Sequence, residues 1–119
     1  MSADPCLDVA TIERLVQMGG KGFATEMIDL FLSYVPQKLA EARAAEQAGD
    51  LPGVSKAVHP IKSSAGHIGA RPLWDLAARM EQLASDQHGE SIGAMLAELE
   101  AAYEQVKAPL QARRKALGA

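Results

Sequence analysis

Between Asp50 and Ala70 the chain reads D-L-P-G-V-S-K-A-V-H-P-I-K-S-S-A-G-H-I-G-A. Asp50 is a favourable helix N-cap, Pro52 suits a first helical turn, and Gly69 is a favourable stop, so this segment predicts a helix over about 51–68. On a helical wheel the apolar residues fall within an arc of about 100°. They are Leu51, Val54, Val58, Ile61, Ala65 and Ile68. We therefore expect an amphipathic helix that packs one face into a core.

His59 lies about 130° from the centre of this apolar arc, which predicts that its ring points away from the core. Its side of the helix carries small or basic residues: Ser55, Lys62, Ser63 and Gly66. An exposed imidazole is a natural nucleophile near neutral pH. Lys62 is three residues further on, where its ammonium can reach the space above the ring, favour the neutral imidazole and later pair with phosphoryl oxygens. The pattern is typical of a side chain that accepts a phosphoryl group from another protein.

A surface histidine without any function is the simplest alternative, because exposed polar residues usually need none. A metal site that joins His59 to His67 is a second alternative. The two residues are about 80° apart on the wheel and no cysteine or acidic residue is suitably spaced, so no metal site is predicted. His88 stands beside Gly89 in a predicted loop, and we assign it no role.

The sequence before this helix predicts two more helical segments. Asp8 is a candidate N-cap for a short first helix, which Gly19-Gly20 should end. A second segment runs from about Phe23 to Ala48, and Pro36 should kink it or divide it in two. Seven of the nine residues from Met27 to Val35 are apolar, more than one core stripe needs. Part of this face is expected either to be exposed for a partner or to be covered by the first helix.

The sequence after it predicts two further helices. Pro72 should open the first of them, with Leu73, Leu76, Met80 and Leu83 directed inward. Gly89 separates it from the second, whose apolar spacing alternates between four and three residues, as in a helix that packs against neighbours. Its apolar set is Ile92, Leu96, Leu99, Tyr103, Val106 and Leu110. With no strand pattern anywhere, we expect an all-α fold: an antiparallel four-helix bundle with a short additional N-terminal helix, forming one domain over residues 1–119.

Composition narrows the class of protein. The chain has 119 residues, 48% of them apolar and 23% charged, which is typical of one folded domain. Its net charge of −3 and pI of about 5.6 argue against a nucleic-acid binder, and the basic run 113–115 suits a solvated helix end. Cys6 is the single cysteine, so no internal disulfide is expected. Residues 1–7 lack the apolar core of a signal peptide and no stretch has the length of a membrane span, so we expect a soluble, cytosolic protein.

The run from Ala57 to Ala70 resembles the phosphotransfer (HPt) domains of bacterial multistep phosphorelays: a histidine, a lysine three residues later, small residues, and an apolar-Gly-Ala ending. The resemblance extends from Leu7 to about Leu110. It implies that His59 carries the phosphoryl group on the ring nitrogen far from the backbone and that Lys62 stabilises it. The implied partner is the receiver domain of a response regulator, with a hybrid histidine kinase as a further candidate. The resemblance also implies that magnesium belongs to the receiver and that this chain binds no cofactor.

Two positions depart from the pattern of that family. The residue four after the histidine is commonly glycine, and here it is Ser63, which either narrows access to the ring or offers a hydrogen bond. Pro60 follows the histidine, lacks the amide that would bond to Lys56, and should bend the helix there. With Ser55, Gly66 and His67 as candidate partner-binding residues, both departures bear on the choice of partner.

Other functions remain open. The glycine-rich run 19–22 lacks the spacing of a phosphate-binding loop, so we expect a phosphocarrier and not an enzyme. One alternative is a non-transferring module that binds receiver domains. A histidine-kinase dimerisation fragment is another, although Pro60 stands where such a domain favours an acidic residue and the chain is too short for an ATP-binding domain. The apolar pattern is accounted for within one bundle, so a monomer is expected.

Overall fold

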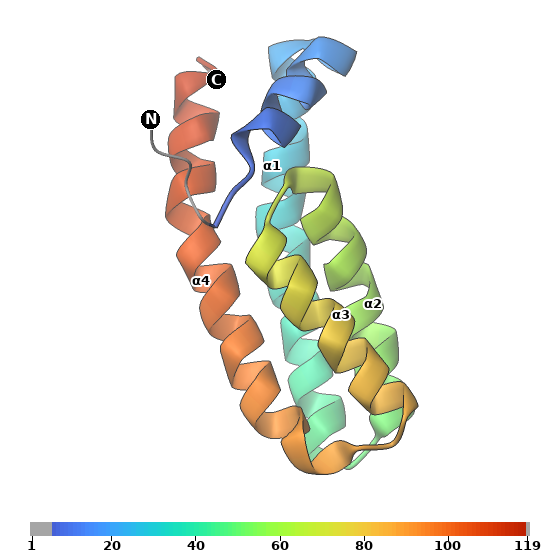
Figure 1. Cartoon of the computed structure of the whole chain (residues 1–119). Helices are drawn as coiled ribbons and strands as arrows, with labels where there is room; N and C mark the ends of the chain where they lie inside the picture. Colours follow the sequence, from blue (N-terminus) through green and yellow to red (C-terminus); the bar gives the residue numbers. More distant parts are fainter. Residues whose placement is uncertain (1–5, 119) are drawn as a thin grey trace.

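The computed structural model describes residues 6–118 and contains four α-helices and one short 3₁₀ turn. They are α1 (Val9–Gln47), α2 (Leu51–Ile68), α3 (Arg71–Ser85), η1 (Gly89–Ser91) and α4 (Ile92–Ala116). The described residues contain no strand, so the predicted all-α class is confirmed. Successive helices run up and down the long axis of the molecule, which measures 44 × 26 × 20 Å (Figure 1). The predicted domain also includes residues 1–5 and 119, which lie outside the described part.

The two ends of α2 form as the sequence predicts. The Asp50 carboxylate accepts a hydrogen bond from the Gly53 amide at 3.0 Å, which satisfies one of the free amides of the first turn. At the other end Gly69 has a φ of 86°, and its amide donates to the Ala65 carbonyl at 2.9 Å. A side chain is strained in this left-handed conformation, so glycine is the residue that ends the helix cleanly. The predicted bounds of this helix are confirmed.

The two N-terminal helical segments join into the single element α1. Asp8 caps it, accepting from the Ala10 amide at 3.2 Å, as predicted. At Gly20 the chain leaves helical geometry, with φ 91° and ψ 176°, and then resumes the helix at once. The expected stop at Gly19-Gly20 is therefore a break at one residue and not a connecting loop. Figure 1 shows the result as a sharp change of direction at the top of α1.

Pro36 does not divide α1, contrary to one of the two expected outcomes. A proline has no amide hydrogen, so the Leu32 carbonyl one turn earlier loses its helical donor. The hydroxyl of Tyr103 on α4 donates to this carbonyl at 2.9 Å. Burial raises the pKa of Tyr103, with Glu104 adding to the effect, so the hydroxyl stays protonated and remains a donor. The helix continues through Pro36, and a neighbouring helix supplies the hydrogen bond that the Leu32 carbonyl would otherwise lack.

One apolar core runs between the helices, and the sequence predicts most of it. Val58 and Ile61 of α2 are fully buried, as are Leu96 and Leu99 of α4. The main difference lies in α3, where Leu76 and Leu83 are only partly buried. The fully or nearly buried positions of α3 are Leu73, Ala77, Met80 and Ala84. Small alanines take two of these positions, which lets α3 lie close to its neighbours.

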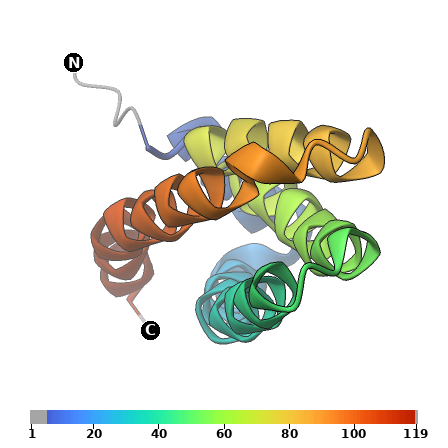
Figure 2. The same cartoon turned by 90° about the horizontal axis from the view of Figure 1, so that it is seen from below.

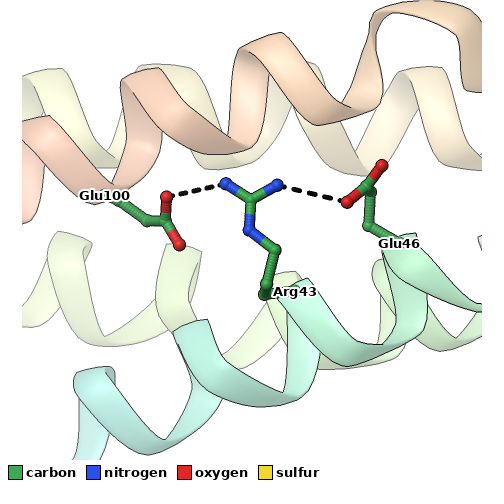
Figure 3. A network of polar contacts seen from close by, with 3 residues as sticks. All are labelled: Arg43, Glu46 and Glu100. Carbon is green, nitrogen blue, oxygen red and sulfur yellow. Dashed lines mark hydrogen bonds and ion pairs between the residues drawn. The ribbon is translucent and has the colours of Figure 1, made fainter.

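Charged side chains add contacts between α1 and α4. Arg43 of α1 bonds to Glu100 of α4 at 2.8 Å and to Glu46 at 3.1 Å (Figure 3). Arg114 makes a second link, with both Asp29 oxygens, at 2.6 and 3.0 Å. The two pairs link α1 and α4 at separate points along their lengths, although α4 is tilted relative to the other helices (Figure 2). None of the described helices is both long and apolar enough to cross a membrane.

Candidate functional site

His59 stands on the outer face of α2, at mid-helix. Its side chain is 58% exposed, whereas Val58 and Ile61 on either side are fully buried. The amphipathic pattern forces this arrangement, because burial of the apolar arc turns residue 59 outward. The predicted orientation of the ring is therefore observed.

Glu81 on α3 joins the two candidate residues of α2. One carboxylate oxygen, Oε2, lies 2.7 Å from His59 Nδ1. The other, Oε1, lies 2.7 Å from Lys62 Nζ. The three side chains thus form a continuous polar chain across the α2–α3 contact, with one carboxylate in the middle.

The contact with Glu81 fixes which ring nitrogen of His59 is nucleophilic. A carboxylate only accepts hydrogen bonds, so Nδ1 must carry the proton and donate it to Glu81. In the neutral ring the lone pair then belongs to Nε2, the nitrogen further from the backbone. The contact therefore leaves the Nε2 lone pair of an exposed ring available for a reaction.

The Glu81 carboxyl is ionised at neutral pH. Partial burial acts to raise its pKa, but the hydrogen bonds from Lys62 and His59, together with their charges, outweigh it, so the pKa lies below its usual value. The carboxyl is 22% exposed, so water screens the interaction only in part. A negative charge beside Nδ1 is consequently a constant feature of the site.

Lys62 lies where the sequence places it, but its ammonium has a different partner from the one expected. Spacing alone predicts that it reaches toward the imidazole. In the structure the ammonium pairs with Glu81, and His59 contacts the opposite oxygen of the same carboxylate. The link between cation and imidazole is therefore indirect.

The other predicted site residues spread along the exposed face of α2. Ser63 is exposed one turn beyond His59, and Gly66 and His67 are exposed another turn further. Ser55 lies at the opposite end, half-buried, where it lines a polar hollow with Lys56 and Ser85. The structure thus brings His59 and Lys62 together through Glu81, and separates Ser55 from Gly66 and His67 along the helix.

Apolar side chains gather around the C-terminal half of α2. The large hydrophobic residues that are exposed between residues 6 and 118 are Met18, Leu30, Tyr34 and Trp74. All four line surface pockets of about 290, 290 and 340 Å³ that also include Gly66 or His67. We call these four residues the apolar collar.

Gly66 has no side chain to project from α2 between the residues of the apolar collar. A Cβ atom at this position would lie 3.3 Å from Cδ1 of Trp74, closer than most such contacts. The indole of Trp74 therefore lies against the backbone of α2, where a side chain would otherwise stand. Gly66 also lines the pockets on both of its sides, so the surface is continuous from Trp74 toward Met18.

No group of three or more His, Cys, Asp or Glu side chains is placed to hold a metal ion in the stretch from residue 6 to 118. His88 lies 3.9 Å from Glu90 on the surface. The chemistry that these residues can supply is that of an exposed imidazole with a carboxylate and an ammonium beside it.

Sequence reasoning missed two contributors, Glu81 and Trp74. Glu81 follows Met80, which was predicted to face the core, in a helix to which the sequence assigned no site residue. Its position beside a buried methionine indicates that Glu81 lies near a helix contact, but not which helix it meets. Trp74 gave no signal beyond its place in the first turn of the same helix.

Known proteins resemble this chain in both sequence pattern and fold. The family model described as Hpt domain matches residues 26–109. Histidine-containing phosphotransfer protein B of Pseudomonas aeruginosa PAO1 has a similar structure, with a TM-score of 0.90, 21% identity, and coverage of 95% of this chain and 97% of that one. A histidine-containing phosphotransfer protein from maize gives a TM-score of 0.81 at 21% identity, covering 95% and 85%. Among curated proteins, none matches the sequence significantly.

The high TM-scores of the two structural neighbours establish the fold. Their sequence identities of 21% are too low to establish a shared function. The family model shows more, since it matches well over half of the chain, in a range that contains His59, Lys62 and Glu81. Proteins of this kind are phosphocarriers and not classical enzymes, and membership supports a role in a phosphotransfer relay. This chain belongs to the Hpt domain family.

Proposed function

We propose that this chain is a phosphorelay intermediate: it accepts a phosphoryl group on His59 from the phospho-aspartate of a receiver domain and passes it to another receiver. The observation that carries this proposal is the contact between His59 Nδ1 and Glu81 at 2.7 Å on an otherwise exposed ring. It leaves Nε2 as the free nucleophile, at the end of the ring that a partner reaches first.

The proposed transfer is a single displacement at phosphorus. The Nε2 lone pair attacks the phosphorus while the bond to the aspartyl oxygen breaks, and the electron pair leaves with the receiver carboxylate. The ring becomes a phospho-imidazolium whose Nδ1 keeps its proton and donates it in a hydrogen bond to Glu81. Lys62 is near enough to offset the charge of the phosphoryl oxygens. Passing the group on is the same step in reverse, with a second carboxylate as the nucleophile.

The receiver supplies what this chain does not need to hold. Its acidic pocket would hold magnesium, which would neutralise the negative charge of the phosphoryl group in the transition state. The bundle contributes a rigidly held nucleophile and one cation. This division agrees with a phosphocarrier that has no catalytic centre of its own. We further expect the chain to act as a monomer in the cytoplasm.

The apolar collar is the proposed docking surface for the receiver. Its pockets include Gly66 and His67, about two turns along α2 from His59, and Leu30 and Tyr34 are exposed there instead of being covered by the start of α1. Solvent-exposed apolar residues that cluster on one face mark protein contacts more often than scattered ones do. Ser63 lies between the collar and His59, so a docked receiver would pass over its hydroxyl.

The test is incubation with a phosphorylated receiver domain, comparing the native chain with His59→Gln and His67→Gln. We expect label on the native chain and on His67→Gln, and none on His59→Gln. Equal labelling of the native chain and His59→Gln would mean another acceptor and would overturn the assignment.

Two further measurements, a receiver pull-down and labelling with ATP, separate the alternatives. A non-transferring interaction module would bind the receiver in a pull-down but never become labelled. A fragment of a histidine kinase would take label from ATP through an added kinase catalytic domain, with no receiver present. Either result would replace the proposed function.

A further inference from the structure

The carboxylate of Glu81 has both oxygens engaged, one by the acceptor ring and one by the cation that should stabilise the product. Oε2 contacts His59 Nδ1 and Oε1 contacts Lys62 Nζ, each at 2.7 Å. A lysine without an anionic partner would be free to pair with the phosphoryl group and would stabilise phosphohistidine more strongly. Here the cation is already paired with an anion of the same chain.

We propose that the negative charge of Glu81 keeps the phosphoryl group on His59 labile, so that the chain relays the group instead of storing it. This rests on the proposed function. Glu81 acts through two other residues and is therefore a positioning residue. Two effects contribute, and both act in the same direction.

The first effect is competition for Lys62. Its ammonium is 28% exposed and Glu81 is 22% exposed, so both charges are partly withdrawn from water and their attraction exceeds that of a fully exposed pair. A phosphoryl group on Nε2 must draw the ammonium away from this carboxylate or share it. Glu81 thereby reduces the stabilisation that Lys62 gives to phosphohistidine.

The second effect acts on the leaving group. When phosphohistidine gives up its phosphoryl group, the P–Nε2 bond breaks and its electron pair returns to Nε2. If Nδ1 is protonated, the ring leaves as neutral imidazole, and if it is not, it must leave as the much more basic imidazolate. A carboxylate that accepts the Nδ1 hydrogen favours the protonated ring, because a hydrogen bond to the charged form stabilises it.

The replacement Glu81→Gln isolates the charge. The amide oxygen still accepts the Nδ1 hydrogen, so the tautomer of the free ring is preserved, and the volume is almost unchanged. The amide nitrogen offers no acceptor to Lys62, whose ammonium becomes available. Glu81→Ala, by contrast, removes both the charge and the acceptor. Comparison of the two variants separates the charge effect from the orientation of the ring.

The experiment phosphorylates His59 with phosphoramidate, a small donor that needs no receiver, and follows the loss of phosphohistidine by ³¹P NMR. We expect the half-life to lengthen about three- to tenfold in Glu81→Gln, as the loss of about one partly screened charge interaction implies. In a mixture with a receiver, the equilibrium should move toward the histidine by a similar factor. In a Lys62→Ala background the effect should shrink, because competition for the cation is absent.

The half-life is the readout that a purely structural role would not change. Imidazole ¹⁵N shifts check the state of the ring in the two variants: Glu81→Gln should keep the Nδ1–H tautomer and Glu81→Ala should lose it. An unchanged or shorter half-life in Glu81→Gln, with labelling at His59 intact, overturns the inference and leaves the proposed function standing. If Glu81→Gln does not fold, Glu81→Ala supplies the test, because it removes the same charge and should also lengthen the half-life; an unchanged half-life there overturns the inference. Absence of label on native His59 from any receiver instead overturns the proposed function.

Discussion

The hydroxyl of Tyr103 on α4 donates to the carbonyl of Leu32 on α1 at 2.9 Å, one turn before Pro36. The carbonyl is the one that Pro36 leaves without its helical donor. The ring of Tyr103 also lies against Phe31, with centroids 5.9 Å apart. The Tyr103 side chain therefore supplies the missing hydrogen bond to the backbone of α1 and also packs α4 against that helix.

This relationship predicts that the cost of Tyr103→Phe depends on residue 36. Loss of the hydroxyl leaves the Leu32 carbonyl unsatisfied in a half-buried position, which should lower the free energy of unfolding by about 1–2 kcal/mol. With Pro36→Ala the new amide of residue 36 can donate to Leu32, so Tyr103→Phe should cost less there. Urea denaturation of the four proteins gives the coupling energy, and Tyr34→Phe is the control. Additive effects would mean that the two groups do not serve the same carbonyl.

Lys62→Ala should slow phosphoryl transfer from a receiver. The loss of one charge-assisted contact in the transition state, worth about 1.5–3 kcal/mol, corresponds to roughly a 10- to 100-fold lower rate. Stability should change by less than about 1 kcal/mol, since the pair with Glu81 is partly exposed. Rapid-quench kinetics and thermal melting check the two statements. Lys56→Ala, an exposed lysine on the same helix, is the control, and an equal slowing there would indicate a general effect of net charge.

Leu30→Gln should weaken docking and leave the chemistry intact. Leu30 is 56% exposed, so its replacement disturbs the core little, but a receiver seated on the apolar collar would lose a buried leucine. A loss of about 1–2 kcal/mol corresponds to roughly a 5- to 30-fold higher KM for the phosphorylated receiver. Labelling by phosphoramidate should be unchanged. Ala101→Gln, exposed on α4, is the control, and an unchanged KM for Leu30→Gln would place the docking surface elsewhere.

Ser63→Gly and Ser63→Ala together separate the two effects considered for this hydroxyl. If the side chain narrows the approach to His59, the transfer rate should rise from Ser to Ala to Gly. If the hydroxyl instead bonds to the phosphoryl group, both variants should be slower than the native chain by a similar factor. Stability must be measured alongside, because glycine costs a helix about 1 kcal/mol relative to alanine. Equal rates for all three with every receiver tried would leave Ser63 without a role.

Glu81 should make stability depend on pH in the acid range. Its pKa is lower in the folded protein than in the unfolded chain, so its contribution is complete above the unfolded-state pKa and is lost as the pH falls through the folded one. The native chain should therefore exceed Glu81→Gln in stability near neutrality, and the difference should shrink as the carboxyl is protonated. Urea titrations at a series of pH values measure this difference, with Glu98→Gln as the control. A difference that does not change with pH would indicate that Glu81 contributes through packing alone.

The amino-acid sequence was sufficient to predict the local features. The limits of α2 follow from Asp50 and Gly69, and the outward direction of His59 follows from the apolar arc, because caps and helical periodicity depend on neighbours within a few residues. The break near Gly20 was predicted for the same reason. Its form, a single non-helical residue inside one long element, was not, because the packing of both segments against α2 decides it.

The sequence alone determined that this chain folds into helices and that one imidazole among them faces outward next to a lysine. Only the tertiary structure decided that Glu81 of α3 links that imidazole to Lys62. It also decided that Tyr103 of α4 donates to the carbonyl that Pro36 leaves without a donor, and that four apolar residues of α1 and α3 surround the C-terminal half of α2. The reason is geometric. Periodicity specifies which face of a helix is apolar, whereas the pairing of polar groups depends on the rotation and height of the neighbouring helices, which only the packed core sets.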